Sequence, residues 1–206
     1  MSIVLQGSTS GSVTLQEPAV AGTTVLDLPA VSGTVLTTGS SGQSIPKAAL
    51  PTGSVLQVVS TTKTDTFSTT STSFTDITGL SVSITPTSAS SKILVFYSFQ
   101  ITFVGAVTGS FSRLMRNSTA IGIGDADGSR SRATLAAYAG DSAGINGSGV
   151  HSTNFLDSPA TTSATTYKVQ MFTQSGTSYI NRTVGDADVS ATPRNAATIT
   201  VMEIAA

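Results

Sequence analysis

The chain has 206 residues and a formal net charge of −1, and only 10% of its residues are charged. The few basic residues are scattered and form no patch that would neutralise a run of phosphates, so nucleic acid is excluded as a predicted partner. The sequence has no cysteine for disulfides or thiolate metal sites. It also has no apolar run of the length that a signal peptide or a membrane span needs, so no membrane partner is predicted.

The composition favours an all-β fold. Serine and threonine supply about a third of the residues, and the chain also contains 19 glycines and 7 prolines. Threonine suits pleated, half-buried surfaces, whereas serine, glycine and proline suit the turns between short strands. No segment has the pattern of an amphipathic helix, and the hydrophobic fraction of 39% is sufficient for a packed core.

The first 46 residues contain a repeat of eleven residues. Gly11, Gly22 and Gly33 mark the period, and a Pro-Ala-Val triplet follows each of the first two glycines at the same distance. Each unit is predicted to be a short extended segment followed by a turn. A strand pair of this size is marginal in water, so the repeat needs copies of itself or a partner surface to pack against.

The repeat is nearly uncharged, because Glu17 and Asp27 are the only charged residues before Pro46. Little in it therefore discourages edge pairing between copies. We predict that residues 1–46 form an arm or stalk, either intertwined in a homo-oligomer or docked on a partner; the alternative is an N-terminal part of the main domain. The apolar positions predicted to make these contacts are Val13, Leu15, Val20, Val25, Leu26, Leu28, Val31 and Val35.

A linker at residues 47–53 is predicted to separate this arm from a body at residues 54–206. Strand patterns become dense in the body, and Gln174–Thr177 is predicted to be a hairpin turn. About eight to ten strands at this spacing predict an antiparallel β-sandwich of jelly-roll-like form. The predicted strands are 55–59, 80–85, 92–103, 112–117, 133–138, 153–156, 165–172, 178–183 and 197–204.

Two of these strands make specific predictions about burial. Leu80, Val82 and Ile84 alternate with hydroxyl residues, which is typical of a strand with one buried face. The segment 92–103 is apolar on both faces in its first half. That pattern predicts a central strand covered on its second face as well.

One short motif resembles a catalytic site. Gly140–Gly144 reads Gly-Asp-Ser-Ala-Gly, the G-x-S-x-G pattern of serine hydrolases, and the only histidine, His151, follows it closely. The nucleophile Ser142 would need a strand before it and a helix after it, whereas residues 140–152 have the composition of a Gly/Ser-rich loop. We therefore predict no hydrolase, and we predict that His151 sits at a loop edge or makes a local hydrogen bond.

The tetrapeptide Gly-Asp-Ala-Asp occurs twice and could supply hard oxygen ligands for Ca²⁺. Its carboxylates are Asp125 and Asp127 in the first copy and Asp186 and Asp188 in the second. The rest of a calcium motif is missing from both. Arg130, Arg132 or Arg182 could pair with these carboxylates instead, so no metal and no cofactor is predicted.

Several segments resemble virion structural proteins of marine and cyanobacterial tailed phages. The opening GSTSGSVTLQEPAVAGTTVLDLPAVSGTVLTT is similar to N-terminal segments of such proteins. The strings LMRNSTAIGIGDADGSRSRA, NFLDSPATTSATTYKVQ and YINRTVGDAD, closed by ITVMEIAA, resemble a C-terminal domain of the same proteins. The resemblance implies a trimeric, non-enzymatic β protein located in the virion, assembled in the host cytoplasm, whose partners are itself and capsid or tail proteins.

The leading hypothesis is therefore a head decoration, cement or head-fibre protein anchored by its repeat. The short chain favours a stubby projection over a long receptor-reaching fibre. The alternative is a tail fibre or a receptor-binding protein for a host surface glycan. Sugar recognition needs exposed aromatic rings, and the chain has no tryptophan and only four tyrosines.

Overall fold

A computed structural model describes residues 3–6, 12–15, 50–104, 109–138 and 147–206. The chain divides into two compact units, Met1–Ile45 and Pro46–Ala206. In the first unit, β1 (Ile3–Gln6) and β2 (Ser12–Leu15) pair in antiparallel fashion, with Val13 opposite Leu5. Val13 and Leu15 of the predicted contact positions thus belong to β2. The other six, which are Val20, Val25, Leu26, Leu28, Val31 and Val35, lie outside the described residues.

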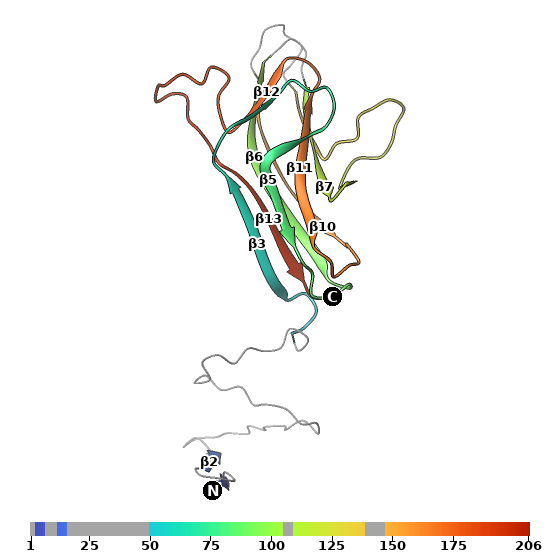
Figure 1. Cartoon of the computed structure of the whole chain (residues 1–206), viewed down its shortest axis with the longest axis vertical. Coiled ribbons are helices and arrows are strands. Elements are labelled where there is room, and N and C mark those ends of the chain that lie inside the picture. The colour runs from blue at the N-terminus through green and yellow to red at the C-terminus, as the bar shows by residue number, and fades with distance from the viewer. Residues whose placement is uncertain (1–2, 7–11, 16–49, 105–108, 139–146) are drawn as a thin grey trace, which may run out of the picture. The chain divides into compact units, whose positions relative to one another are not determined.

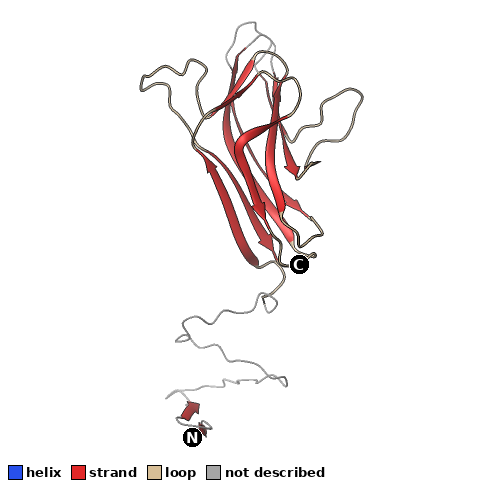
Figure 2. Ribbon diagram, in the orientation of Figure 1, coloured by secondary structure: helices blue, strands red, loops and turns tan. Residues whose placement is uncertain are grey.

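The described residues of the second unit, called the body below, form eleven strands and no helix, which confirms the predicted all-β class (Figures 1 and 2). In the described ranges, no helix has the length and apolar character needed to span a membrane. The strands are β3 (Val55–Lys63), β4 (Phe67–Thr69), β5 (Thr75–Ile84), β6 (Lys92–Val104), β7 (Gly109–Arg116), β8 (Thr119–Ile121), β9 (Leu135–Tyr138), β10 (Gly147–Asp157), β11 (Thr165–Thr173), β12 (Thr177–Ile180) and β13 (Ala197–Ile204).

The strands form two antiparallel sheets in a sandwich. The six-stranded sheet has the order β3-β13-β6-β12-β4. Strands β13 and β12 pair one after the other with one edge of β6, and β10 pairs with the opposite edge. The five-stranded sheet has the order β5-β11-β7-β8, and β9 pairs with β7 as well. The long strand β6 organises the first sheet, because β13 pairs with its first half and β12 with its end.

The core lies between the two sheets and follows from the alternation of each strand. Leu80, Val82 and Ile84 are buried while Ser81 and Ser83 between them are exposed, which confirms the predicted faces of β5. Aromatic rings fill much of the core. Its largest fully buried side chains are Tyr97, Tyr167, Phe99, Phe103, Leu80, Ile84, Ile93, Ile101, Leu114, Met171, Ile180 and Ile199.

The body differs from the predictions at several points. The segment predicted as a Gly/Ser-rich loop up to residue 152 contributes the first half of β10, which pairs with β6 from Gly147 to Asp157. The predicted hairpin at Gln174–Thr177 is wrong, because β11 and β12 belong to different sheets. The chain does turn there, with Gly176 at a φ of 71°, but the turn passes from one sheet to the other.

The prediction for residues 92–103 is half right. The strand β6 is central in its sheet, and Val95 and Tyr97 on its inner face are buried. Its outer face carries Leu94 and Phe96, and Phe96 remains 38% exposed. The described part of the chain therefore covers only one of the two apolar faces of this strand.

Candidate functional site

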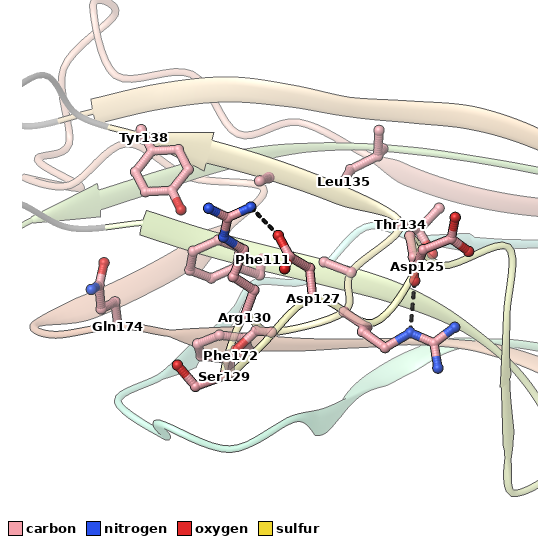
Figure 3. Close-up of a pocket in the computed structure, with 15 residues that line it drawn as sticks. Phe111, Asp125, Asp127, Ser129, Arg130, Thr134, Leu135, Tyr138, Phe172 and Gln174 are labelled. Carbon is pink, nitrogen blue, oxygen red and sulfur yellow. Dashed lines mark hydrogen bonds and ion pairs between the residues drawn. The ribbon is translucent and has the colours of Figure 1, made fainter.

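A hollow in the described part of the body lies beside β9. The chain between β8 and β9 forms one wall, and β7, the end of β11 and the turn after it form the other (Figure 3). Its volume is about 710 Å³, which falls in the range of small-molecule sites. The lining residues are Phe111, Gly124, Asp125, Asp127, Ser129, Arg130, Ser131, Arg132, Ala133, Thr134, Leu135, Ala136, Tyr138, Phe172 and Gln174.

One side of this pocket is aromatic. Phe111 stacks on Phe172 with 4.6 Å between ring centroids, and Tyr138 meets Phe111 edge-on at 5.3 Å. Gly109 makes this arrangement fit, because a Cβ there would lie 2.6 Å from a Phe111 ring carbon and 2.8 Å from a Tyr138 ring carbon. The two phenylalanines are nearly buried, whereas Tyr138 is 66% exposed. The pocket therefore presents one accessible aromatic ring on a fixed base.

The other side of the pocket is polar and carries the first Gly-Asp-Ala-Asp segment. Asp127 forms an ion pair with Arg130, and the two side chains meet at the pocket wall in Figure 3. The Arg132 Nε donates a hydrogen bond of 2.6 Å to the Gly124 carbonyl oxygen. Asp127 thus pairs with an arginine, which was the predicted alternative to a calcium site.

The second Gly-Asp-Ala-Asp segment lies in the chain between β12 and β13, away from this pocket. Asp186 forms ion pairs with Arg194 at 2.6 Å and with Arg182 at 3.5 Å. Asp188 lines a separate small hollow beside Asp186. Within the described ranges, no three His, Asp or Glu side chains come close enough together to hold a metal ion.

The structure corrects the placement of His151. It lies in the middle of β10 and is only 2% exposed, so it is not at a loop edge. Its Nδ1 is 2.7 Å from the Ser112 Oγ on β7, a contact that joins the two sheets and is not local. Its ring lies 5.2 Å from the ring of Phe99. Burial lowers the pKa of His151 to about 4, because the charged imidazolium would lose its solvation.

A serine bonded to a histidine is a feature of hydrolases, but this pair is enclosed. Ser112 has no exposed surface, and the His151 ring lies between the sheets, so no substrate reaches either side chain. Nucleophilic catalysis needs a nucleophile that faces a substrate pocket. Ser142 of the G-x-S-x-G motif lies outside the described residues.

Two buried carboxylates were missed by the sequence analysis. Asp157 on β10 accepts hydrogen bonds from the Arg116 guanidinium at 2.8 Å and from the Tyr167 hydroxyl at 2.7 Å. These partners lie on β7 and β11, so the contact clamps the two sheets together. Burial raises the pKa of Tyr167, and the hydrogen bond to the Asp157 carboxylate raises it further.

Glu203 on β13 is the second buried carboxylate and has no exposed surface. It accepts hydrogen bonds from the Thr87 backbone N and the Thr87 Oγ1, each at 2.7 Å, and from the Gln57 Nε2. Burial alone would raise the pKa of Glu203, but these hydrogen bonds outweigh it, so the pKa is lowered. Both carboxylates are fully engaged in holding the fold.

The pocket around Tyr138 therefore presents groups that can bind a polar ligand by stacking and hydrogen bonding. In comparisons with known proteins, no protein-family model matches the chain and no curated protein matches it.

Proposed function

We propose that the chain is a non-enzymatic structural protein of a bacteriophage virion, a trimeric head decoration, cement or head-fibre protein attached through its N-terminal unit. The observation that carries this proposal is the division into a small N-terminal unit and a compact β-sandwich at Ile45. The first unit contains the nearly uncharged repeat, which is suited to docking. The second contains all the phenylalanines and tyrosines and so has the means to fold as a separate projecting module.

The jelly-roll form of the sandwich is part of the proposal. It is supported by the path of the chain, since each successive strand from β5 to β7, and again from β9 to β12, lies in the opposite sheet. Such crossing between two antiparallel sheets is what a jelly roll requires.

The attachment role is tested by binding to particles that lack this protein. We expect the full chain to bind them and a chain truncated to residues 46–206 to bind at least about tenfold more weakly, because the repeat supplies the contacts.

Single substitutions in the full chain make this test more specific. Leu26→Asp should weaken binding, whereas Thr24→Asp, which adds the same charge at a position outside the predicted apolar set, should not. Equal binding by the truncated chain and the full chain would show that the body carries the anchor.

A second candidate function is recognition of a host surface glycan, as part of a tail fibre or a receptor-binding protein. The observation that favours it is the exposed ring of Tyr138 in a pocket that is also lined by Asp125, Asp127, Arg130 and Gln174 (Figure 3). A flat ring surrounded by hydrogen-bonding groups is the combination that sugars need.

Tyr138→Ala tests this second function on an array of bacterial surface polysaccharides. If the pocket binds a glycan, the substitution should weaken binding at least about tenfold, as expected for the loss of a central aromatic contact. Val189→Ala is the matched control, because Val189 is 58% exposed and does not line the pocket. Unchanged binding by the Tyr138 variant would exclude the pocket as the glycan site.

A further inference from the structure

Asp127 is followed directly by a glycine in the chain between β8 and β9. The backbone N of Arg130 donates to the Asp127 carbonyl oxygen at 3.2 Å, which closes a turn around Gly128 and Ser129. Gly128 has a φ of 55°, a left-handed conformation that glycine adopts without the strain that a Cβ brings. The turn therefore favours a residue without a side chain at the position after Asp127.

The groups on either side of the bond between Asp127 and Gly128 are accessible. The Asp127 side chain is 68% exposed, and Arg130 alone engages its carboxylate among the described residues. A Cβ added to Gly128 would meet no atom within 4 Å beyond its two chain neighbours. The Gly128 backbone N donates no hydrogen bond to any residue of the described ranges. Neither packing nor hydrogen bonding from these ranges therefore keeps this nitrogen away from the carboxyl group.

We propose that Asp127 is a modification site, at which the aspartate converts spontaneously to isoaspartate through a succinimide. In the first step, the Gly128 N attacks the Asp127 Cγ, and the new bond between them closes a five-membered ring. The carboxyl hydroxyl leaves with the amide proton as one water molecule. Ring closure is favoured because the two reacting groups are held in one short segment and need no diffusional encounter.

Water opens the ring in the second step, and the product depends on which bond to the nitrogen breaks. Cleavage of the bond to Cγ restores aspartate. Cleavage of the bond to the original carbonyl carbon leaves the chain running through Cγ, and this product is isoaspartate. One water molecule is released and one is consumed, no electrons are transferred, and neither an enzyme nor a cofactor takes part.

The ion pair between Asp127 and Arg130 opposes the reaction only weakly. The Arg130 side chain is 81% exposed and its partner is exposed as well, so water and salt screen their attraction. The carboxyl group therefore leaves the pair readily and can turn towards the Gly128 N.

The second Gly-Asp-Ala-Asp segment contains the same carboxylates without these properties. Asp188 is followed by Val189, whose branched side chain crowds the nitrogen that would attack. The Val189 backbone N also donates to the Ala187 carbonyl oxygen at 2.9 Å. Asp186 is followed by Ala187, and two arginines hold its carboxylate. The same tetrapeptide is therefore expected to react in the first copy and not in the second.

Isoaspartate at position 127 changes the polar side of the pocket around Tyr138. It adds one carbon to the backbone and leaves the free carboxylate on Cα instead of on Cβ. The carboxylate that meets Arg130 at the pocket wall is thereby moved (Figure 3). An aged chain thus presents a different polar surface to a ligand from a new chain. The reaction needs only this turn and water, so it does not depend on the proposed virion role.

The test follows the full chain during several weeks in neutral buffer, with samples taken at the start and at the end. Trypsin cuts after lysine and arginine, so Asp125 and Asp127 share the peptide 117–130, whereas Asp186 and Asp188 share the peptide 183–194. Isoaspartate has the same mass as aspartate, but chromatography separates the two peptides that differ by it and electron-transfer fragmentation locates it. The sample from the start gives the background from handling.

We expect isoaspartate to accumulate at least about tenfold faster at position 127 than at either aspartate of the second copy, which corresponds to a barrier lower by about 1.4 kcal/mol. Asp127→Glu keeps the carboxylate but would have to close a less favourable six-membered ring, so it should lower the isoaspartate of peptide 117–130 at least about tenfold. Asp125→Glu makes the same change two residues away and should leave the isoaspartate unchanged. Both positions are exposed, so neither variant touches the core.

Equal accumulation at position 127 and in the second copy would overturn the proposal, because the turn would then confer no reactivity. An unchanged amount of isoaspartate in the Asp127→Glu variant would overturn it as well, by placing the modification at Asp125. Neither result bears on attachment to particles, which is measured with freshly purified chain.

Discussion

Arg116→Met is expected to lower the free energy of unfolding by about 3 kcal/mol, because it leaves the Asp157 carboxylate buried without its cation. Asp157 is 6% exposed and accepts two hydrogen bonds from the Arg116 Nη1, at 2.8 and 3.0 Å. Without Arg116, the Tyr167 hydroxyl would still donate its hydrogen bond to Asp157. The Arg116 side chain is 27% exposed, so some water can reach the site. The expected loss of stability therefore lies at the lower end of the range for breaking a buried ion pair.

The unfolding of this variant is measured by denaturant titration at one fixed protein concentration. Arg130→Met is the matched control, since the Asp127–Arg130 pair is exposed on both sides and should contribute less than about 1 kcal/mol. Adding Asp157→Asn to Arg116→Met removes the uncompensated charge and should restore part of the lost stability. If Arg116→Met lowers the free energy of unfolding by no more than Arg130→Met does, the contact between Arg116 and Asp157 does not hold the two sheets together.

Local sequence pattern was sufficient for strands whose burial alternates or is continuous. Residues 197–204 form β13 over the predicted range, and the alternation of β5 matches its buried and exposed faces. The start of β10 was missed because Gly147 and Gly149 are typical of loops. In the fold, a Cβ at Gly147 would lie 2.4 Å from the Phe103 ring, and one at Gly149 would lie 3.3 Å from the Ala137 Cβ. These glycines serve close packing, which only the tertiary structure reveals.

Contacts between charged residues were predictable when the partners are close in sequence. Arg130 and Arg182 lie three and four residues from the carboxylates that they pair with, and both pairings were among the predicted alternatives. Asp157 lies 41 residues from Arg116, and Glu203 lies 116 residues from Thr87. No local pattern links such residues, because the sandwich brings them together only after both sheets have formed.

The pocket around Tyr138 was equally inaccessible to sequence reasoning. Phe111, Tyr138 and Phe172 come from three different strands, β7, β9 and β11. The count of four tyrosines indicated few stacking surfaces, but it did not indicate that Tyr138 is exposed while Tyr97 and Tyr167 are buried. Exposure depends on which face of a strand a ring occupies, and short strands such as β9 contain too few residues to define their faces.

Lowering the pH from 7 to 4 is expected to destabilise the fold by about 3 kcal/mol through His151 alone. The pKa of His151 is about 4 in the folded chain, against 6.5 for an unperturbed histidine. Between these two values the unfolded chain binds a proton and the folded chain does not, so stability rises with pH across this window. The cause is burial between the sheets, where Nδ1 contacts Ser112 and Nε2 has no hydrogen-bond partner among the described residues.

His151→Gln tests this prediction, because glutamine keeps polar atoms at the site and does not titrate. The free energy of unfolding is measured for both chains by denaturant titration at pH 7, 6, 5 and 4. From pH 7 to pH 4, the variant should lose about 3 kcal/mol less stability than the unchanged chain. Glu203 acts in a lower window, since its pKa is lowered and its contribution is lost only as the pH falls below the ordinary value for glutamate. The two groups therefore separate along the pH axis. A variant that loses as much stability as the unchanged chain between pH 6.5 and 4.5 would show that His151 is protonated without cost in the folded state.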